Sequence, residues 1–332
     1  MTGEARRHWG DLGRRLAPND PESEDLLAPV ATAARSEEDP ATGSLARQVP
    51  PVTGSRTRTD RCPGALRPWE AADGLLVRLR LVGGRVSAQA LRSLVEVAAD
   101  HGDGRVHVTS RANLQVRALP GADGRLDPSV LAALERTGLL PTRTHERVRN
   151  VMVSPQTGLA GGLADLRPVA AQLDERLCAD PDLATLPGRF LFVLDDGRGD
   201  LVSHTCDLGA VVLDPRAAQL RVGRRWGPVV PLGEAAARIA ELAHEFVVRR
   251  GRGPTAPWHV EELRAPLTTV TEPDRRLPDE QGPLPYGAVP GGRHVEVPAA
   301  GLDRHDVRRI TADVDHVIVT PWRGVLVPEE AR

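Results

Sequence analysis

The sequence predicts an α+β fold, in which strands and helices do not alternate regularly along the chain. The first ordered part has the pattern strand, helix, strand, strand, helix, which argues against a doubly wound parallel sheet. A shorter form of this pattern returns near the end of the chain, after a central stretch with its own strands and helices. The two copies carry similar tetrapeptides spaced 211 residues apart, Val108-Thr109-Ser110-Arg111 and Val319-Thr320-Pro321-Trp322. Such a repeat predicts a duplicated domain.

The composition is that of a soluble globular protein with about two domains. The 332 residues are 40% hydrophobic and 27% charged, and the net charge of −2 gives no general attraction for nucleic acid or an anionic membrane. Because no apolar run reaches the length of a membrane span and no signal-peptide core opens the chain, we expect a cytoplasmic protein with reduced cysteines. All 43 basic residues are arginine, which excludes Schiff-base chemistry and a P-loop lysine.

The predicted first domain covers residues 61–145. It follows a leader, residues 1–60, that lacks a sustained apolar period and is expected to be flexible. A strand over residues 75–82 opens the domain. Ser87 then caps a helix whose apolar positions share one face: Leu91, Leu94, Val95 and Ala98. A second helix is marked by Asp-Pro at residues 127–128, with the aspartate as its cap, and by a glycine past its end.

Residues 106–117 read VHVTSRANLQVR and alternate between an apolar or small face and a wholly polar face. We expect two strands joined by a sharp turn, so the alternation breaks near residues 110–112. The polar face contains no acid and several fork-shaped donors: Arg111, Asn113, Gln115 and Arg117. Guanidinium and amide groups can hold carboxylate oxygens in fixed geometry. Two interpretations therefore stay open, a polar face that meets water and a surface for a carboxylate-rich ligand.

The predicted central domain covers residues 146–255 and combines two helices with several strands. One helix begins near Asp165, and a longer one near Gly233. The predicted strands span residues 190–194, 208–213 and 219–222. The last two strands flank an Asp-Pro turn and are expected to pair with each other.

A linker and a second, shorter domain complete the predicted order. Residues 256–292 contain many prolines and glycines, which is typical of a connecting segment. Residues 293–332 then repeat part of the first domain. Their helix begins near Asp303, and their last strand covers residues 324–327. A ligand held between the two copies would meet both of the repeated motifs.

Four ordered blocks of the sequence resemble the nitrite and sulfite reductase superfamily. Thr109–Arg117 resembles the tetrapyrrole-binding motif of its ferredoxin-like half-domain, and Arg61–Gly84 resembles the opening of precorrin-3B synthases, its cobalamin-pathway branch. Arg147–Gly162 resembles the next landmark, an Arg-Asn pair before a Ser-Pro loop, and Val319–Pro328 resembles the second half-domain motif. The resemblance covers about residues 61–328 and implies duplicated ferredoxin-like half-domains around a central α/β domain of the nitrite/sulfite reductase type.

The resemblance implies a carboxylate-rich tetrapyrrole, either a precorrin or sirohaem, as the bound partner. Arginine suits such a ligand because it stays charged and can grip two carboxylate oxygens at once. On this basis we assign carboxylate contacts to Arg111, Asn113, Gln115, Arg117, Arg80, Arg78, Arg149, Asn150 and Arg323. The implied reaction is the oxygen-dependent hydroxylation and lactone formation on a precorrin. The sequence assigns no residue to catalysis and none to a metal.

The cysteines depart from the family pattern. The family resemblance also implies a [4Fe–4S] cluster held by four cysteines beyond the second half-domain, whereas this chain has only Cys62, Cys178 and Cys206, without a close pair. We therefore expect a missing C-terminal segment, a cysteine-bearing partner, or a member that lacks the cluster. Two alternatives to the synthase-like function remain. One is a fragment of an assimilatory nitrite or sulfite reductase, against which the absent lysines count, and the other is a non-catalytic tetrapyrrole-binding protein.

Overall fold

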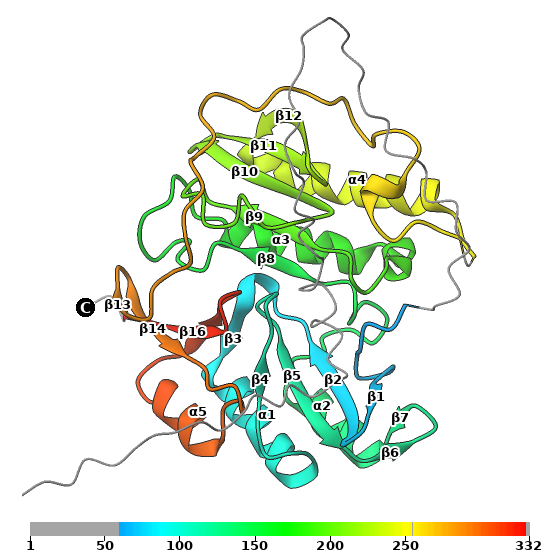
Figure 1. Ribbon diagram of the computed structural model, residues 1–332, viewed down its shortest axis with the longest axis vertical. Coiled ribbons are helices and arrows are strands. Elements are labelled where there is room, and N and C mark those ends of the chain that lie inside the picture. The colour runs from blue at the N-terminus through cyan, green and yellow to red at the C-terminus, as the bar shows by residue number, and fades with distance from the viewer. Residues whose placement is uncertain (1–59, 254, 330–332) are drawn as a thin grey trace, which may run out of the picture. The chain divides into compact units, whose positions relative to one another are not determined.

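The structure is a computed structural model that describes residues 60–253 and 255–329, so nearly all of the predicted leader lies outside the described residues. The first sheet is antiparallel and has the strand order β1-β2-β5-β4 (Figure 1). The elements of this first half-domain are β1 (Trp69–Ala71), β2 (Gly74–Leu79), α1 (Ala88–His101), β4 (His107–Val108), β5 (Leu114–Leu119), the hairpin β6 (Gly121–Ala122) and β7 (Arg125–Leu126), and α2 (Pro128–Arg136). Ser87 caps α1 as predicted, whereas the side chain of Asp127 makes no capping bond to α2.

The second half-domain contributes a sheet with the strand order β13-β14-β16-β15-β3. Its elements are β13 (Gly287–Val289), β14 (Gly292–Glu296), α5 (Arg304–Ile310), β15 (His316–Val319) and β16 (Gly324–Pro328), with β3 (Arg85–Ser87) added from the first half-domain. Two predicted boundaries need correction. β13 lies within the predicted linker, and β3 leaves the first half-domain because it pairs antiparallel with β15.

The two half-domains repeat each other in topology and in one detailed turn. The order β1-β2-β5-β4 corresponds to β13-β14-β16-β15. In each turn a threonine N–H donates to a carbonyl four residues later, and the threonine hydroxyl accepts from the amide of that same residue: Thr109 with Asn113, and Thr320 with Gly324. The residue before each acceptor has a positive φ, 55° at Ala112 and 57° at Arg323. These paired features confirm the predicted duplication.

The central domain contains a mixed sheet with the strand order β12-β11-β10-β9-β8. Its elements are β8 (Val151–Val153), α3 (Arg167–Ala179), β9 (Phe192–Asp195), β10 (Leu208–Asp214), β11 (Ala217–Val222), β12 (Arg225–Pro231) and α4 (Ala235–Arg250). Short 3-10 helices are η2 (Val82–Gly84), η3 (Pro181–Thr185), η4 (Leu232–Glu234) and η5 (Val260–Glu262). The predicted pairing of β10 with β11 is confirmed.

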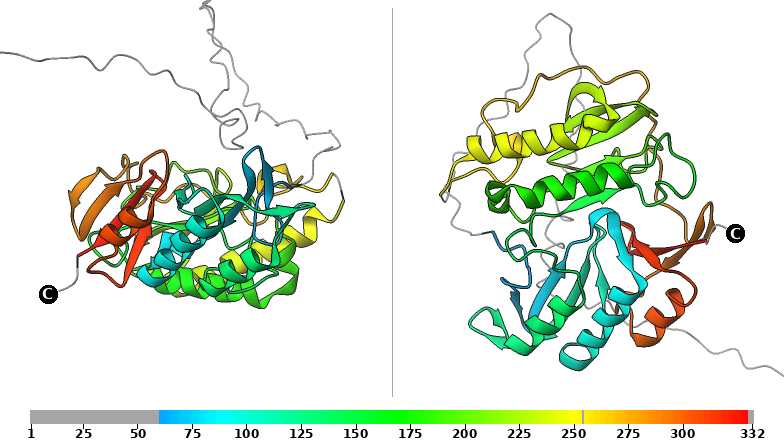
Figure 2. Two further views of the ribbon diagram at one scale, coloured as in Figure 1. Left: turned by 90° about the horizontal axis from the view of Figure 1, so that it is seen from below. Right: turned by 180° about the vertical axis from the view of Figure 1, so that it is seen from behind.

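The helices lie together on one side of the sheets (Figure 2). Both half-domains share one buried core, and reciprocal backbone bonds between Val106 and Leu302 join them directly. A second core fills the space between the central sheet, α3 and α4. At its centre the ring of Phe190 lies 5.2 Å from that of Phe192 and 4.9 Å from that of Phe246. On the opposite face of the central sheet, Met152 and Val193 belong to a separate, smaller apolar cluster.

The segment predicted as a linker, residues 256–292, is fixed to the central sheet over much of its length. The Gln219 side chain of β11 donates to the carbonyl of Glu272 and accepts from the amide of Asp274, both at 2.8 Å. Val260 and Leu267 of this segment are buried in the central core. The prolines therefore shape a packed strap, which corrects the prediction of a simple linker. Among the described residues, no helix is long and apolar enough to cross a membrane.

Candidate functional site

Two buried amides join the first half-domain to the central domain. The Oδ1 atom of Asn113 accepts from the amide of Leu81 at 2.9 Å, and its Nδ2 donates to Asn150 Oδ1 at 2.8 Å. Asn150 in turn donates to the carbonyl of Phe190 at 3.4 Å. The structure therefore brings these two predicted site residues together and bonds both within the protein. Their contact with a ligand stays a prediction.

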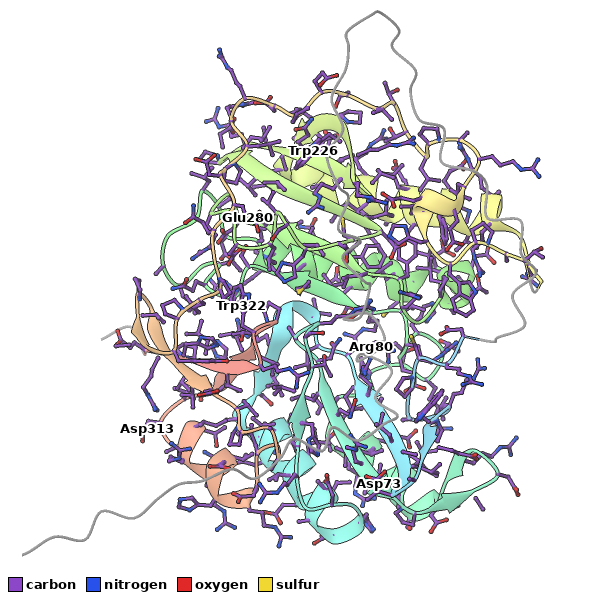
Figure 3. The ribbon with its side chains drawn as sticks, in the orientation of Figure 1. Asp73, Arg80, Trp226, Glu280, Asp313 and Trp322 are labelled. Carbon is purple, nitrogen blue, oxygen red and sulfur yellow. The ribbon has the colours of Figure 1, made fainter. Side chains whose placement is uncertain are left out.

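Three more predicted residues form the polar floor beside these amides. Arg78 donates to Gln115 Oε1 at 3.3 Å, across the β2–β5 pair. Arg80 donates to the carbonyls of Pro63 and Gly188 at 2.9 and 3.3 Å, while its buried Nε has no hydrogen-bond partner. Burial lowers the pKa of Arg80 to about 10, so the side chain keeps its charge at neutral pH. Arg80 lies at the junction of the first half-domain with the central domain (Figure 3).

Two further arginines lie at the edge of this floor. Arg111 is half-buried and donates to the carbonyl of Arg189 at 3.0 Å. Arg189 is exposed, and its side chain makes no hydrogen bond or ion pair with another described residue. We call Arg78, Arg80, Arg111 and Arg189 the arginine cluster. Sequence reasoning missed Arg189, although its place directly before the apolar run of Phe190 was a usable signal for a cation at a strand entrance.

Cys62 lies next to the arginine cluster, and the pKa of its thiol depends on the charge of the cluster. Burial raises the pKa of the Cys62 thiol, and the carboxylate of Asp60 raises it further. The positive charges of Arg80, Arg111 and Arg78 lower that pKa but do not overcome burial. Three guanidinium groups therefore act on the half-buried thiol of Cys62, which stays protonated at neutral pH.

One acid on which Arg111 acts is held deep in the protein. Asp207 is 3% exposed and accepts hydrogen bonds from the amides of Leu191 and Val260. Burial raises its pKa to about 6, although the charges of His259 and Arg111 lower it. Two further carboxylates act on this region, Glu146 on Arg80 and Asp60 on Cys62.

The other three predicted residues have different partners. Arg149 makes two bonds to Asp174 of α3, at 2.5 and 2.6 Å. Arg117 lies 3.4 Å from Asp73 in a partly exposed ion pair. Arg323 is exposed in the second half-domain, and its carbonyl accepts from a neighbouring amide. The structure does not bond any of these three to the arginine cluster, and their role toward a ligand is untested.

The equivalent turn of the second half-domain is aromatic instead of cationic. Trp322, which corresponds to Arg111, packs on a small apolar cluster of the central sheet that includes Met152 and Val193 (Figure 3). Tyr286 donates to the Trp322 carbonyl at 2.6 Å, and its ring lies 4.7 Å from the ring of His294. This turn therefore anchors the second half-domain to the central domain by packing.

The cysteines do not fit an iron–sulfur cluster. Cys62 lies beside the arginine cluster, Cys178 lies near the end of α3, and Cys206 is buried beneath the central sheet. Cys178 is half-buried. A cluster needs several thiolates that converge on one point. Within the described residues, the one group of potential metal ligands that converges contains no cysteine: Asp180, Asp182 and His244.

Comparison with known proteins gives a family for this architecture. Residues 69–134 match the model of the nitrite/sulfite reductase ferredoxin-like half domain, a range that runs from β1 into α2. A precorrin-3B synthase from Sinorhizobium sp. is 30% identical over 209 residues, which are 60% of this chain and 42% of that protein. Sulfite reductase (ferredoxin) 2 from Mycolicibacterium paratuberculosis is 26% identical over 280 residues, 75% of this chain and 46% of that protein.

The similarity to a solved structure agrees with this family. The NirA protein of Mycobacterium tuberculosis superposes with a TM-score of 0.59 at 20% identity, covering 77% of this chain and 54% of that one. At this identity the superposition shows the shared fold. The chain spans less than half the length of the two curated relatives that it matches. The matching half-domain model, the duplicated half-domains and the similarity to a synthase and a reductase support assignment of the chain to the nitrite/sulfite reductase superfamily.

Proposed function

We propose that the chain binds a carboxylate-rich tetrapyrrole beside the arginine cluster, as the tetrapyrrole-binding portion of a precorrin-3B synthase-like protein. The observation that carries this proposal is the gathering of Arg78, Arg80 and Arg111 around the half-buried thiol of Cys62, with Arg189 exposed beside Arg111. The similarity to a precorrin-3B synthase supports the choice of ligand class.

Each part of the cluster would have a distinct task in this proposal. Arg111 and Arg189 lie at the surface, where their guanidinium groups can grip carboxylate arms of a macrocycle in bidentate geometry. Arg78 and Arg80 are nearly buried and supply positive charge from below, where water screens it less. Asn113 and Asn150 keep the two domains in register under the ligand. The chain's own residues would thus bind and orient the substrate, which is the positioning part of catalysis.

The complete reaction is a wider proposal. Oxygen-dependent hydroxylation and lactone formation on a precorrin require electron and oxygen chemistry, which iron centres supply in enzymes of this kind. Because the three cysteines of this chain do not converge, we derive no step through a cluster from its residues. A cysteine-bearing partner or a further segment would have to complete that centre.

A sulfite or nitrite reductase portion is the second candidate. The similarity to a sulfite reductase over 75% of this chain favours it. The absence of lysine counts against it, because the sulfite reductases of this superfamily place lysines beside their anion. A non-catalytic tetrapyrrole-binding protein is the third. Preference for a precorrin over sirohaem would favour the synthase-like function, and the opposite preference would favour the reductase. Ligand binding without turnover, even after a cysteine-bearing partner is added, would favour the non-catalytic binding protein.

The test is an anaerobic absorbance titration of the full chain with sirohaem and, separately, with a precorrin. We expect a saturable spectral change, and we expect Arg111→Ala to raise Kd about tenfold, equivalent to about 1.4 kcal/mol. Arg176→Ala is the matched control, because Arg176 is exposed on α3 and lies outside the cluster. Circular dichroism would verify that both variants fold. A spectrum that does not change with either ligand would overturn the tetrapyrrole assignment.

A further inference from the structure

A second recess lies between α3, η2, β15 and the loop that follows α2. It is a cavity of about 570 Å³, a size typical of sites for small organic ligands. Its walls are mainly apolar and include Val82, Leu139, Pro141, Val153, Leu159 and Ile318. Of the arginine cluster, Arg80 lines the cavity, whereas Arg78, Arg111 and Arg189 do not. The cavity therefore shares the buried Arg80 with the arginine cluster, but not the surface at Arg111 and Arg189 that is proposed to hold the tetrapyrrole.

The charged groups of the cavity are predominantly positive. Four arginines and one acid line it: Arg80, Arg85, Arg149, Arg167 and Asp174. Asp174 is already paired with Arg149 through two hydrogen bonds. Arg167 is paired with Asp165, and the guanidinium group of Arg80 donates hydrogen bonds to backbone carbonyls. The local charge balance thus favours an anion, while most of the lining offers only apolar contact.

Arg85 is the group best placed to receive that anion. Its side chain is exposed, and it makes no hydrogen bond or ion pair with another described residue. Arg85 and Arg167 both act electrostatically on His316, which also lines the cavity, so the two cations lie at one side of it. Burial lowers the pKa of His316, and the two arginines lower it further, which keeps the imidazole neutral at pH 7. A neutral ring can pack against an apolar ligand body.

We propose that this cavity binds a small organic anion, with an aromatic or branched apolar body against the inner walls and a single carboxylate, sulfonate or phosphate at Arg85. The apolar lining would supply most of the affinity through removal of apolar surface from water. The charge-assisted bond to Arg85 would supply the selectivity for an anion. The site does not depend on the proposed tetrapyrrole function.

The test uses two fluorescent probes with the same rings and the full chain. The probes are 8-anilinonaphthalene-1-sulfonate, an anion, and N-phenyl-1-naphthylamine, its neutral counterpart. We expect both to bind saturably. Arg85→Glu should weaken the sulfonate about tenfold or more and the neutral probe less than about twofold, since only the sulfonate meets the charge. Ala171→Trp should abolish binding of both probes, because Ala171 lines the cavity and is exposed, so a large ring can occupy the site without disturbing the core.

Matched controls exist on the same helix. Gln172→Trp adds the same ring and Arg176→Glu makes the same charge change, both at exposed positions of α3 that do not line the cavity. Neither should change either affinity by more than about twofold, since neither residue touches the ligand. Equal weakening of both probes by Arg85→Glu would overturn the anion selectivity. Retained binding in Ala171→Trp, or no saturable binding by the unmodified chain, would overturn the site itself.

Discussion

The two half-domains build the same turn and use it in opposite ways. In the first turn the side chains of Arg111 and Asn113 are polar and connect to the central domain through hydrogen bonds. In the second turn the equivalent residues are Trp322 and Gly324, and the connection is made by an indole ring on apolar side chains. The backbone hydrogen bonds and the positive φ are common to both turns. The two turns thus share the same backbone conformation. Their side chains differ, so that the first turn is cationic and the second anchors its half-domain by packing.

The difference between Asn113 and Gly324 follows from their neighbours. Asn113 fills its site with an amide that satisfies two buried partners. At Gly324 there is no room for a side chain, because a Cβ would lie 2.1 Å from Nε2 of His294. His294 uses that nitrogen to bond the hydroxyl of Thr320 at 2.9 Å. One turn is therefore stabilised by its own amide, and the other by a histidine from the neighbouring strand.

The largest expected effect is the loss of the amide in the first turn. Asn113→Leu leaves the amide of Leu81 and the side chain of Asn150 without their partner. We expect the free energy of unfolding to fall by about 3 kcal/mol, since each unsatisfied buried group costs about 1–3 kcal/mol. Urea unfolding would measure it, with the exposed Gln172→Leu as control. A loss below about 1 kcal/mol would mean that the amides do not hold this junction.

The second turn should respond to added volume. Gly324→Ala introduces a Cβ that conflicts with the His294 ring, and we expect a loss of about 2 kcal/mol from overpacking. Gly233→Ala is the matched control, because a Cβ there meets no atom within 4 Å. Thermal unfolding of both variants would compare them. Equal melting temperatures would show that the histidine ring can move away freely.

Acid should weaken the second turn selectively. Burial lowers the pKa of His294 below its ordinary value of 6.5, although the carbonyls of Pro285 and Leu284 partly oppose this. The unfolded chain then binds a proton at a higher pH than the folded chain, so this contribution to stability is complete above pH 6.5 and is lost as the pH falls through the folded pKa. Hydrogen exchange at pH 7.5 and 5.5 should show β14 and β16 losing protection in the wild type and less so in His294→Gln. Identical pH dependence in the variant would contradict this origin.

The smallest expected effect concerns the shared backbone. Ala112 and Arg323 both adopt a left-handed conformation, which costs a residue with a side chain about 1–2 kcal/mol. Arg323→Gly should stabilise the protein by about 0.5 kcal/mol, after the flexibility of glycine in the unfolded chain is subtracted. Ala112→Gly should gain less, because it also removes a methyl group that is buried in the core. Ala171→Gly, in the helical α3, should instead destabilise by about 1 kcal/mol. A destabilising effect of Arg323→Gly would contradict the strain at this turn.

The sequence predicted local structure better than it predicted how buried polar groups are used. Ser87 and the Asp-Pro start of α2 specify helices through short-range physics, and the repeated tetrapeptide specified the duplication. β3 belongs to the second sheet because it pairs with β15, which is far away along the chain. Local sequence patterns do not predict such a pairing. The sequence identifies which residues have fork-shaped donors. It does not show that Asn113 bonds Asn150, because this contact depends on packing between the domains.

The most direct test of the account is the affinity for sirohaem of two equivalent variants, Arg111→Ala and Trp322→Ala, measured under conditions where both are folded. If the first turn is the cationic surface and the second the anchor, Arg111→Ala raises Kd about tenfold. In that case Trp322→Ala lowers the melting temperature while Kd stays within about twofold, because it removes packing and not a ligand contact. A larger rise in Kd for Trp322→Ala than for Arg111→Ala would contradict this division of tasks between the half-domains.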